Sequence, residues 1–316
     1  MKVLVVSGFL GAGKTTFITE MARRSRKKFV VIENEMGAVG VDGGFLSSSL
    51  GQDFDIWELT QGCICCSMKA DFAASVLTIE NVLQPDFLLV EPTGVGMLGS
   101  IMDNLRRIAY ERIELLSPIT VLDSTNWRQY ARDFPDIFFD QIENAGTVIF
   151  SKAEHLAKEE RLILEKLVRK YAPKAAIVSH PYAGQTDRWW DDLWRKAPDG
   201  SLLRENSSIE AGADLAVVSL EAARIPSPAA MTAFLEDGLR GRFGSLIRAK
   251  GTVSAGNSVL RFDIAGAGYC LTGTEASGTT QAVFIGRELD TEKLCLSLSA
   301  RKAGYGLSLD KFTDSL

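Results

Sequence analysis

The sequence has no long apolar run. Although 46% of its 316 residues are hydrophobic, no window reaches the roughly 18 uninterrupted apolar residues that a membrane-spanning helix needs. It also lacks a charged leader with a cleavage site, because the first residues already have the apolar, β-branched character of a strand. We therefore expect a cytoplasmic protein with no membrane-spanning helix.

Basic charge is also scarce. The chain has 35 Lys and Arg residues against 40 Asp and Glu residues, which gives a formal net charge of −5. Its one basic cluster, Arg23 to Lys28, closes a predicted helix, where positive side chains complement the helix dipole. Proteins that bind nucleic acid carry a basic stripe, so we expect neither nucleic acid nor a membrane surface as a partner.

Cysteine is sparse but clustered. Of the five cysteines, three occupy four consecutive positions, Cys63, Cys65 and Cys66. Thiolates are strong ligands for Zn²⁺ and related metals, but three so close together cannot all bind one ion without strain. We therefore predict a site of two cysteines plus an outside ligand, with Glu33 as the candidate. A redox pair and buried cysteines in a tight loop are the alternatives. The isolated cysteines, expected to be small core residues, are Cys270 and Cys295.

Short apolar runs alternate with helical patterns over the first part of the chain. This alternation predicts a doubly wound α/β domain with a mostly parallel sheet at residues 1–200. The predicted strands are KVLVVS, FVVIE, FDIWEL, DFLLVE, PITVLD, TVIFS and AAIVS, and the predicted helices are 14–25, 68–83, 97–107 and 157–171. A linker, 195–212, precedes a smaller α+β domain at residues 210–316, with strands LAVVSLE, SLIRAKGTVS, SVLRFDI and AVFIG and helices after Pro226 and near 291–300.

Residues 8–15 match the phosphate-loop motif G-x-x-x-x-G-K-[ST], and they lie between a predicted strand and a predicted helix, as the motif requires. Glycines let backbone N–H groups turn toward phosphate oxygens, and the helix N-terminus attracts the same anion. Lys14 adds a full charge, and the Thr15 hydroxyl is placed to bind Mg²⁺. The expected nucleotide-binding residues of the loop are Gly11, Ala12, Gly13, Lys14, Thr15 and Thr16. An inconsequential glycine turn is the alternative.

Glu91 closes the predicted strand DFLLVE and is followed by Pro92-Thr93-Gly94. A carboxylate at the end of a neighbouring strand can contact Mg²⁺ through water, and the Gly94 amide can approach a γ-phosphate and respond to its loss. We therefore assign Lys14, Thr15, Glu91 and Gly94 to catalysis, with Thr15 and Glu91 on the magnesium side. A plain Pro-Gly turn is the alternative.

The strings GFLGAGKTT, ENEMGAVGVD, GCICC and EPTG occur in this order and resemble the CobW-like metallochaperone GTPases, relatives of the HypB and UreG nickel-insertion proteins. RAKG (248–251) and VFIGRELDTEKL (283–294) resemble the C-terminal domain of that family. The resemblance implies a P-loop GTPase, with slow hydrolysis, that binds GTP or GDP and Mg²⁺ and carries a transition metal. Zn²⁺ is the first candidate, with Co²⁺ or Ni²⁺ as alternatives. It also implies a recipient metalloprotein or cofactor-assembly protein as partner, with a homodimer as a possible assembly.

The chain departs from the family pattern at three places. The base-reading motif Asn-Lys-x-Asp is Ser151-Lys152-Ala153-Glu154, so Lys152 can stack on the base while Glu154 offers a longer carboxylate, and guanine preference is expected to be relaxed. Ala38 stands where relatives carry Glu. The chain also lacks a histidine-rich stretch, and its two histidines, His155 and His180, are expected to be surface or loop residues.

Two functions fit these motifs. The first is a GTP-hydrolysing metallochaperone in which Cys65, with Cys63 or Cys66, holds the metal that hydrolysis releases. The second is a nucleotide-gated protein that controls cofactor loading of a corrinoid enzyme or another metalloenzyme, with structural cysteines and no metal transfer of its own. Nucleotide-dependent metal affinity distinguishes them.

Overall fold

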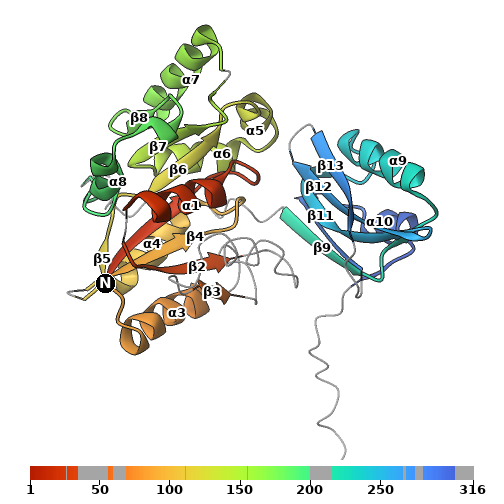
Figure 1. Cartoon of the computed structure of the whole chain (residues 1–316), viewed down its shortest axis with the longest axis horizontal. Coiled ribbons are helices and arrows are strands. Elements are labelled where there is room, and N and C mark those ends of the chain that lie inside the picture. Colours follow the sequence, from red (N-terminus) through yellow and green to blue (C-terminus); the bar gives the residue numbers. More distant parts are fainter. Residues whose placement is uncertain are drawn as a thin grey trace, which may run out of the picture. The chain divides into compact units, whose positions relative to one another are not determined.

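The chain forms two compact units, Met1–Leu215 and Ala216–Leu316. The computed structural model describes residues 1–25, 27–34, 56–59, 69–110, 112–154, 156–199, 215–265, 268–274 and 280–302. Figure 1 draws the first unit in red to green and the second in cyan to blue. Within these ranges, no helix is long and apolar enough to cross a membrane.

The first unit is built on a parallel sheet with strand order β3-β2-β4-β1-β6-β7-β8, and β5 lies beside β1. Its strands are β1 (Lys2–Ser7), β2 (Val30–Asn34), β3 (Ile56–Leu59), β4 (Phe87–Glu91), β5 (Glu114–Leu115), β6 (Ile119–Asp123), β7 (Thr147–Ser151) and β8 (Ala176–Val178). Its helices are α1 (Lys14–Ser25), α3 (Lys69–Val82), α4 (Leu98–Ile108), α5 (Trp127–Asp133), α6 (Pro135–Glu143), α7 (Lys158–Tyr171), α8 (Asp187–Leu193) and the short 3₁₀ helix η2 (Tyr182–Gly184).

Strand β1 divides its side chains between two hydrophobic cores. Successive strand residues point to opposite faces of a sheet, and both faces of this sheet are covered, so a continuous apolar run is favoured over alternation. Leu4 and Val6 pack on one side with residues of α1 and α8. Val3 and Val5 pack on the other side with residues of α3 and α4. The predicted doubly wound α/β fold is therefore confirmed.

Because the strands are parallel, the carboxyl ends of β1, β2, β4, β6 and β7 meet at one edge of the sheet. Open sheets of this kind bind ligands at that edge. The seven strands predicted for this unit are all present, with β3 shorter than the run FDIWEL. The sequence interpretation missed α5, α6 and α8, which have only seven, nine and seven residues, too few turns for a clear helical period.

The second unit is a mostly antiparallel sheet of strand order β13-β12-β11-β14-β9-β15, with β10 beside β11. Buried side chains of α9 and α10 share one core with those of the sheet, so the predicted α+β pattern is confirmed. The strands are β9 (Leu215–Glu221), β10 (Arg224–Ile225), β11 (Ser245–Ala255), β12 (Ser258–Ala265), β13 (Gly268–Thr274), β14 (Gln281–Arg287) and β15 (Arg301–Lys302), and the helices are α9 (Pro228–Leu239) and α10 (Thr291–Ser297).

The two isolated cysteines lie in the second unit. Cys295 is half-buried and packs against the core, as expected of a small apolar side chain. The prediction for Cys270 was wrong, because Cys270 is exposed on β13. Strand β13 pairs along one side with β12, and its residues are mostly exposed, so no core surrounds this thiol.

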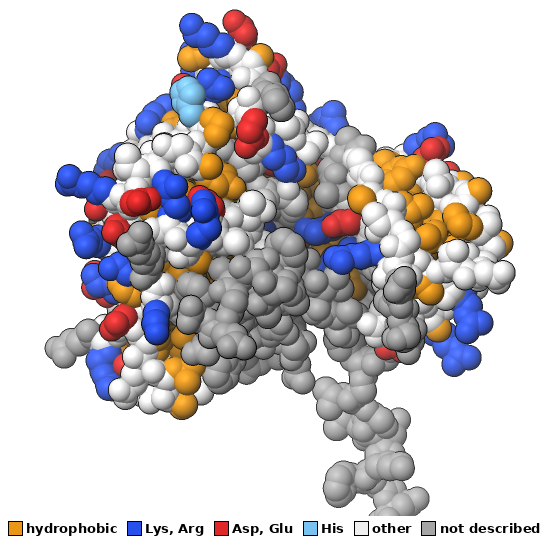
Figure 2. Space-filling view, in the orientation of Figure 1, with side chains coloured by type: hydrophobic (Ala, Val, Ile, Leu, Met, Phe, Trp, Pro, Cys, Tyr) orange, Lys and Arg blue, Asp and Glu red, His pale blue; other side chains and the backbone are white. Residues whose placement is uncertain are grey.

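Charge of both signs is spread over the surface. On the face of the first unit in Figure 2, Lys and Arg side chains alternate with Asp and Glu side chains. Many charged side chains of the first unit pair, such as Arg23 with Glu20 at 2.7 Å and Arg128 with Glu160 at 2.5 Å. The described residues visible on this face form no continuous basic stripe, in line with the small net charge of the sequence.

Candidate functional site: the phosphate loop and the loops beside it

The phosphate loop follows β1 and opens α1, and its glycines have backbone conformations that other residues rarely adopt. Gly8, Gly11 and Gly13 have φ values of 143°, 74° and 88°. A Cβ atom on Gly8 would lie 2.2 Å from the carbonyl oxygen of Val121 in β6. Glycine is therefore needed at position 8 both for its φ and for the close approach of the neighbouring strand.

Lys14 is buried, with 7% of its surface exposed. Its Nζ donates to the carbonyl oxygens of Gly8 at 3.1 Å and Phe9 at 3.4 Å. The ammonium group thus lies against the first two residues of the phosphate loop, and a bound phosphate would accept its hydrogen bonds there. The loop is closed by the Ala12 amide, which donates to the Phe9 carbonyl at 3.1 Å, while Thr16 is exposed on α1.

Thr15, in the first turn of α1, contacts Glu91, the last residue of β4. The Thr15 hydroxyl donates to Oε1 of Glu91 at 3.3 Å, and Glu91 is 9% exposed. A hydroxyl and a carboxylate are hard oxygen ligands of the kind that Mg²⁺ prefers. The structure therefore brings together the two predicted magnesium-side residues, and their chemistry fits that ion.

Gly94 lies directly against the phosphate loop. A Cβ on Gly94 would lie 2.4 Å from the backbone N of Leu10 and 2.6 Å from its Cα. The buried Gln141 of α6 holds the loop in this place, because its Nε2 donates to the carbonyls of Gly94 at 3.3 Å and Gly96 at 3.1 Å. Its own backbone carbonyl accepts from the Thr120 hydroxyl at 2.5 Å. Gln141 therefore joins β6 to the loop after Glu91.

Asp140, the residue before Gln141, binds the start of α4. Asp140 Oδ2 accepts from the Gly99 amide at 3.2 Å, in the first turn of α4, and Oδ1 accepts from Asn144 Nδ2 at 2.9 Å. Burial raises the pKa of Asp140 to about 6, although the amides of Gly99 and Leu98 favour its ionised form. The first turn of α4 is thus capped by a carboxylate from another helix.

The predicted base-reading turn follows β7 and borders the phosphate loop. A Cβ on Gly13 would lie 3.9 Å from the Cβ of Ser151. The Ser151 hydroxyl donates to the Leu122 carbonyl at 3.2 Å, so it faces β6, whereas Glu154 is exposed. Lys152 has a φ of 54°, and its Nζ donates to Oδ2 of Asp123 at 2.7 Å.

Asp123 is a residue of this region that the sequence interpretation missed. It closes β6, its side chain is completely buried, and it also accepts from the amide and hydroxyl of Thr125 at 2.8 and 2.6 Å. Burial alone would raise the pKa of Asp123, but hydrogen bonds from Lys152, Thr125 and Asn126 outweigh it and hold the pKa below its ordinary value. Its place at the end of the run PITVLD was the available signal.

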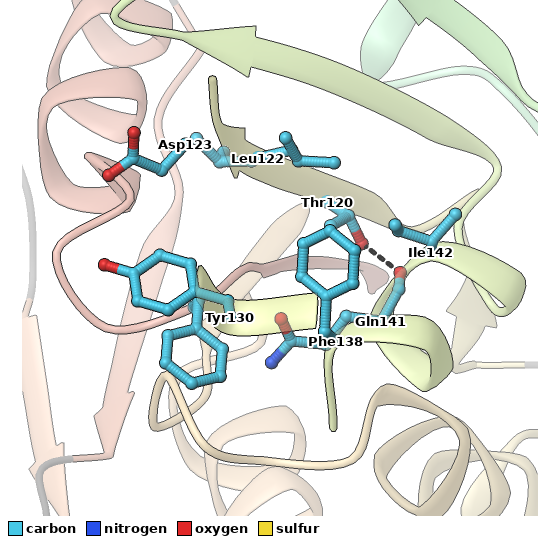
Figure 3. Close-up of a pocket in the computed structure, with 9 residues that line it drawn as sticks. Thr120, Leu122, Asp123, Tyr130, Phe138, Gln141 and Ile142 are labelled. Atoms are coloured by element: carbon cyan, nitrogen blue, oxygen red, sulfur yellow. Dashed lines mark hydrogen bonds between the residues drawn. The ribbon is translucent and has the colours of Figure 1, made fainter. Parts of the chain in front are cut away.

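A small pocket lies between the phosphate loop, β6, α5 and α6 (Figure 3). Phe9 of the loop stacks on Tyr130 of α5, with ring centroids 4.2 Å apart and 24° between the ring planes. Aromatic stacking of this kind fixes side-chain position, so α5 holds the second residue of the phosphate loop. The lining residues are Phe9, Thr120, Val121, Leu122, Asp123, Tyr130, Phe138, Gln141 and Ile142.

The predicted transition-metal site falls outside the described residues. Cys63, Cys65, Cys66 and Ala38 lie there, as does His155. The backbone of Glu33 is part of β2, where it pairs with Glu91 in the strand register. His180 is exposed, with its Nε2 3.2 Å from Arg161 Nη1. Among the residues that the structure does describe, no three His, Cys, Asp or Glu side chains are grouped as a metal site.

Two family models match the chain: the CobW/HypB/UreG nucleotide-binding domain over residues 2–179, and the cobalamin synthesis protein cobW C-terminal domain over residues 215–301. The zinc chaperone YeiR of Escherichia coli K12 is 29% identical over 61% of this chain and 58% of its own length. The zinc-regulated GTPase metalloprotein activator 1 of Schizosaccharomyces pombe is 28% identical over 58% of this chain and 47% of its own length. The chain thus spans about half the length of these relatives.

Among solved structures, the Zn(II)-bound YjiA GTPase from E. coli covers 95% of this chain and 98% of its own, with 19% identity and a TM-score of 0.45. HypB from Helicobacter pylori in complex with nickel covers 61% of this chain and 83% of its own, with 18% identity and a TM-score of 0.42.

Proposed function

Because the chain belongs to the CobW/HypB/UreG family of P-loop GTPases, we propose that it is a metallochaperone that hydrolyses GTP and hands a transition metal to a recipient protein. One observation carries the proposal. The phosphate loop, the Thr15–Glu91 contact and Gly94 lie together at the edge of the sheet where β2 and β3 also end. A change in the nucleotide can therefore act on segments that leave the same edge.

On the nucleotide side, each residue has a distinct task. Lys14 and the loop amides bind the phosphates, and Lys14 exchanges its carbonyl partners for phosphate oxygens. Thr15 and Glu91 would hold Mg²⁺, which would supply charge neutralisation for phosphoryl transfer. The Gly94 amide monitors the γ-phosphate from a loop that already touches Leu10.

On the metal side, we propose that two of Cys63, Cys65 and Cys66, with Glu33 as an outside ligand, bind the cargo. The first of these cysteines is four residues beyond Leu59, the end of β3, and four residues span at most about 14 Å. Glu33 lies next to Glu91 in the strand register. Zn²⁺ is the proposed cargo, because several relatives are named zinc chaperones and Zn²⁺ binds thiolate and carboxylate ligands.

The decisive experiment measures Zn²⁺ affinity by competition with a chromophoric chelator, with GDP and with a non-hydrolysable GTP analogue. Wild type is expected to bind Zn²⁺ with affinities that differ between the two nucleotides by about tenfold, a usual size for coupling between sites. Cys65→Ala/Cys66→Ala should lose the tight site. The matched control is Cys270→Ala/Cys295→Ala, which removes two thiols from the second unit and should behave as wild type.

Two results would refute the metallochaperone proposal. One is a Zn²⁺ affinity that is the same with both nucleotides. The other is an equal loss of Zn²⁺ affinity in Cys65→Ala/Cys66→Ala and in the control Cys270→Ala/Cys295→Ala. If the chain then binds a partner protein in a nucleotide-dependent way without metal, the second function is favoured, that of a nucleotide-gated protein that controls cofactor loading.

The base is tested separately. We propose that guanine is preferred but less strictly than with Asp at position 154, because the Glu154 carboxylate is one methylene longer. Comparing kcat/KM for GTP and ATP in wild type and in Glu154→Asp measures this preference, and the variant should raise the GTP-to-ATP ratio. Equal turnover of both nucleotides by wild type and variant would rule out the guanine assignment.

A further inference from the structure

The turn that is expected to meet the base is fastened to the end of β6. Ser124, which follows Asp123, donates through its hydroxyl to the carbonyls of Ser151 at 2.7 Å and Lys152 at 3.1 Å. Its amide also donates to the Ser151 carbonyl at 3.2 Å. Together with the Lys152–Asp123 bond, these contacts fix both the backbone and the side chain of Lys152.

The bond between Lys152 and Asp123 is asymmetric in burial. The Asp123 side chain has 0% of its surface exposed, whereas that of Lys152 has 44%. Burying a carboxylate without a partner is costly, so the buried end of this pair is strongly anchored and the ammonium is drawn to it. The Lys152 side chain bridges the ends of β7 and β6, and part of its surface stays exposed.

This partly exposed side chain belongs to a turn that lies beside the phosphate loop. Ser151 borders Gly13 of the phosphate loop, so the turn is next to the end of the loop that opens α1. The other two residues of the motif contribute less here, because the Ser151 hydroxyl is directed to Leu122 and Glu154 is exposed. Lys152 is therefore the side chain of this turn whose place is set before any base binds.

We propose that Asp123 is a positioning residue for base recognition, which acts through Lys152 by holding the lysine stem flat for contact with a purine. The inference deepens the proposed function and rests on nucleotide binding by the phosphate loop. In this proposal the Asp123–Lys152 pair places the lysine before the base binds. The usual Asn and Asp of the motif are replaced in this chain by Ser151 and Glu154.

The test separates base binding from phosphate binding. Affinities for GDP, ADP and pyrophosphate, which has no base, are measured with Mg²⁺ for wild type, Asp123→Asn, Lys152→Met and the double variant. Asn keeps the shape of Asp and an acceptor for Thr125, but it loses the charge that holds Lys152. A lost charge-assisted hydrogen bond is expected to weaken GDP binding about tenfold or more, with pyrophosphate binding unchanged.

In the Lys152→Met background, Asp123→Asn should have no further effect on GDP affinity, because its partner is already gone. The control is Asp192→Asn, an exposed carboxylate on α8, which should change neither ligand. The ratio of GDP to pyrophosphate affinity is the readout that a merely structural role would leave unchanged.

Several outcomes would overturn the inference. Equal losses for GDP and pyrophosphate in Asp123→Asn would show a general structural role, and wild-type affinity for GDP would show no role. A loss that persists in the Lys152→Met background would place the effect elsewhere. If wild type binds ADP as well as GDP, the guanine proposal fails while the purine-to-pyrophosphate ratio still tests Asp123. Absence of any purine nucleotide binding to wild type would refute both proposals.

Discussion

Asp140 gives a prediction whose size follows from the structure. Its buried carboxyl accepts from Gly99 and Asn144, near the negative charges of Glu143 and Asp103, and its pKa is raised from 3.8 to about 6. A raised pKa means that the folded protein holds the proton more tightly than the unfolded chain. Ionisation therefore destabilises the fold, so the stability present below about pH 3.8 is lost as pH rises through 6.

The perturbation is Asp140→Asn, which removes this titration. Full ionisation at a pKa of about 6 instead of 3.8 costs about 3 kcal/mol. Between pH 4.5 and pH 7.5, about 2 kcal/mol of that cost develops. The amide must also place its NH₂ group toward Gly99 or Asn144, both donors, but this mismatch does not depend on pH. The stability of wild type minus that of Asp140→Asn should thus fall by about 2 kcal/mol over this range.

The assay is urea unfolding followed by tryptophan fluorescence, without nucleotide. All five tryptophans of the chain, at positions 57, 127, 189, 190 and 194, lie in the first unit, so the signal reports the unit that contains α6. Asp192→Asn, which changes an exposed carboxylate on α8, serves as the matched control. A difference between wild type and Asp140→Asn that is independent of pH, or the same slope in the control, would refute the reasoning.

Three further predictions concern the loops. Gly94→Ala places a Cβ against the Leu10 backbone, and kcat for GTP should fall about 100-fold; retention of wild-type kcat would contradict the close packing. Gln141→Leu removes the side-chain donor to the Gly94 and Gly96 carbonyls, so the free energy of unfolding should fall by about 1–3 kcal/mol. An unchanged urea midpoint would show that these two hydrogen bonds do not stabilise the fold. Gly8→Ala combines an unfavourable φ with a contact to Val121 and should lose nucleotide binding in a GDP titration, whereas Gly184→Ala, with open space around it, should not.

The sequence predicted the parts of the fold that depend on local pattern. The β-branched runs gave the parallel strands, and the glycines with Lys14 and Thr15 gave the phosphate loop, because both signals lie within a few consecutive residues. Glu91 was proposed for a related reason, since an acid at a strand end is visible in the chain. Strand β13 was missed because its sequence, GYCLTGT, is mostly exposed, has no alternation of apolar and polar residues, and contains two glycines, which are uncommon in strands.

The connections between segments could not be predicted in this way. Gln141 is 47 residues from Gly94, and Asp123 is 29 residues from Lys152. A glutamine in a short helix and an aspartate after a strand are common in surface positions, so neither residue type indicates burial. Which polar side chains turn inward depends on which elements become neighbours, and that is a property of the three-dimensional arrangement.

Helix α6 anchors the loop after β4 at the end that leads into α4. Gln141 donates to the carbonyls of Gly94 and Gly96, and Asp140 accepts from the Gly99 amide at the start of α4. The downstream end of this loop is therefore hydrogen-bonded to α6. A displacement of Gly94 would therefore have to break these hydrogen bonds or carry α6 and the start of α4 with it. At its other end the loop follows β4, which pairs with β2, and β2 pairs with β3, so one loop connects α6 and α4 to three neighbouring strands of the sheet.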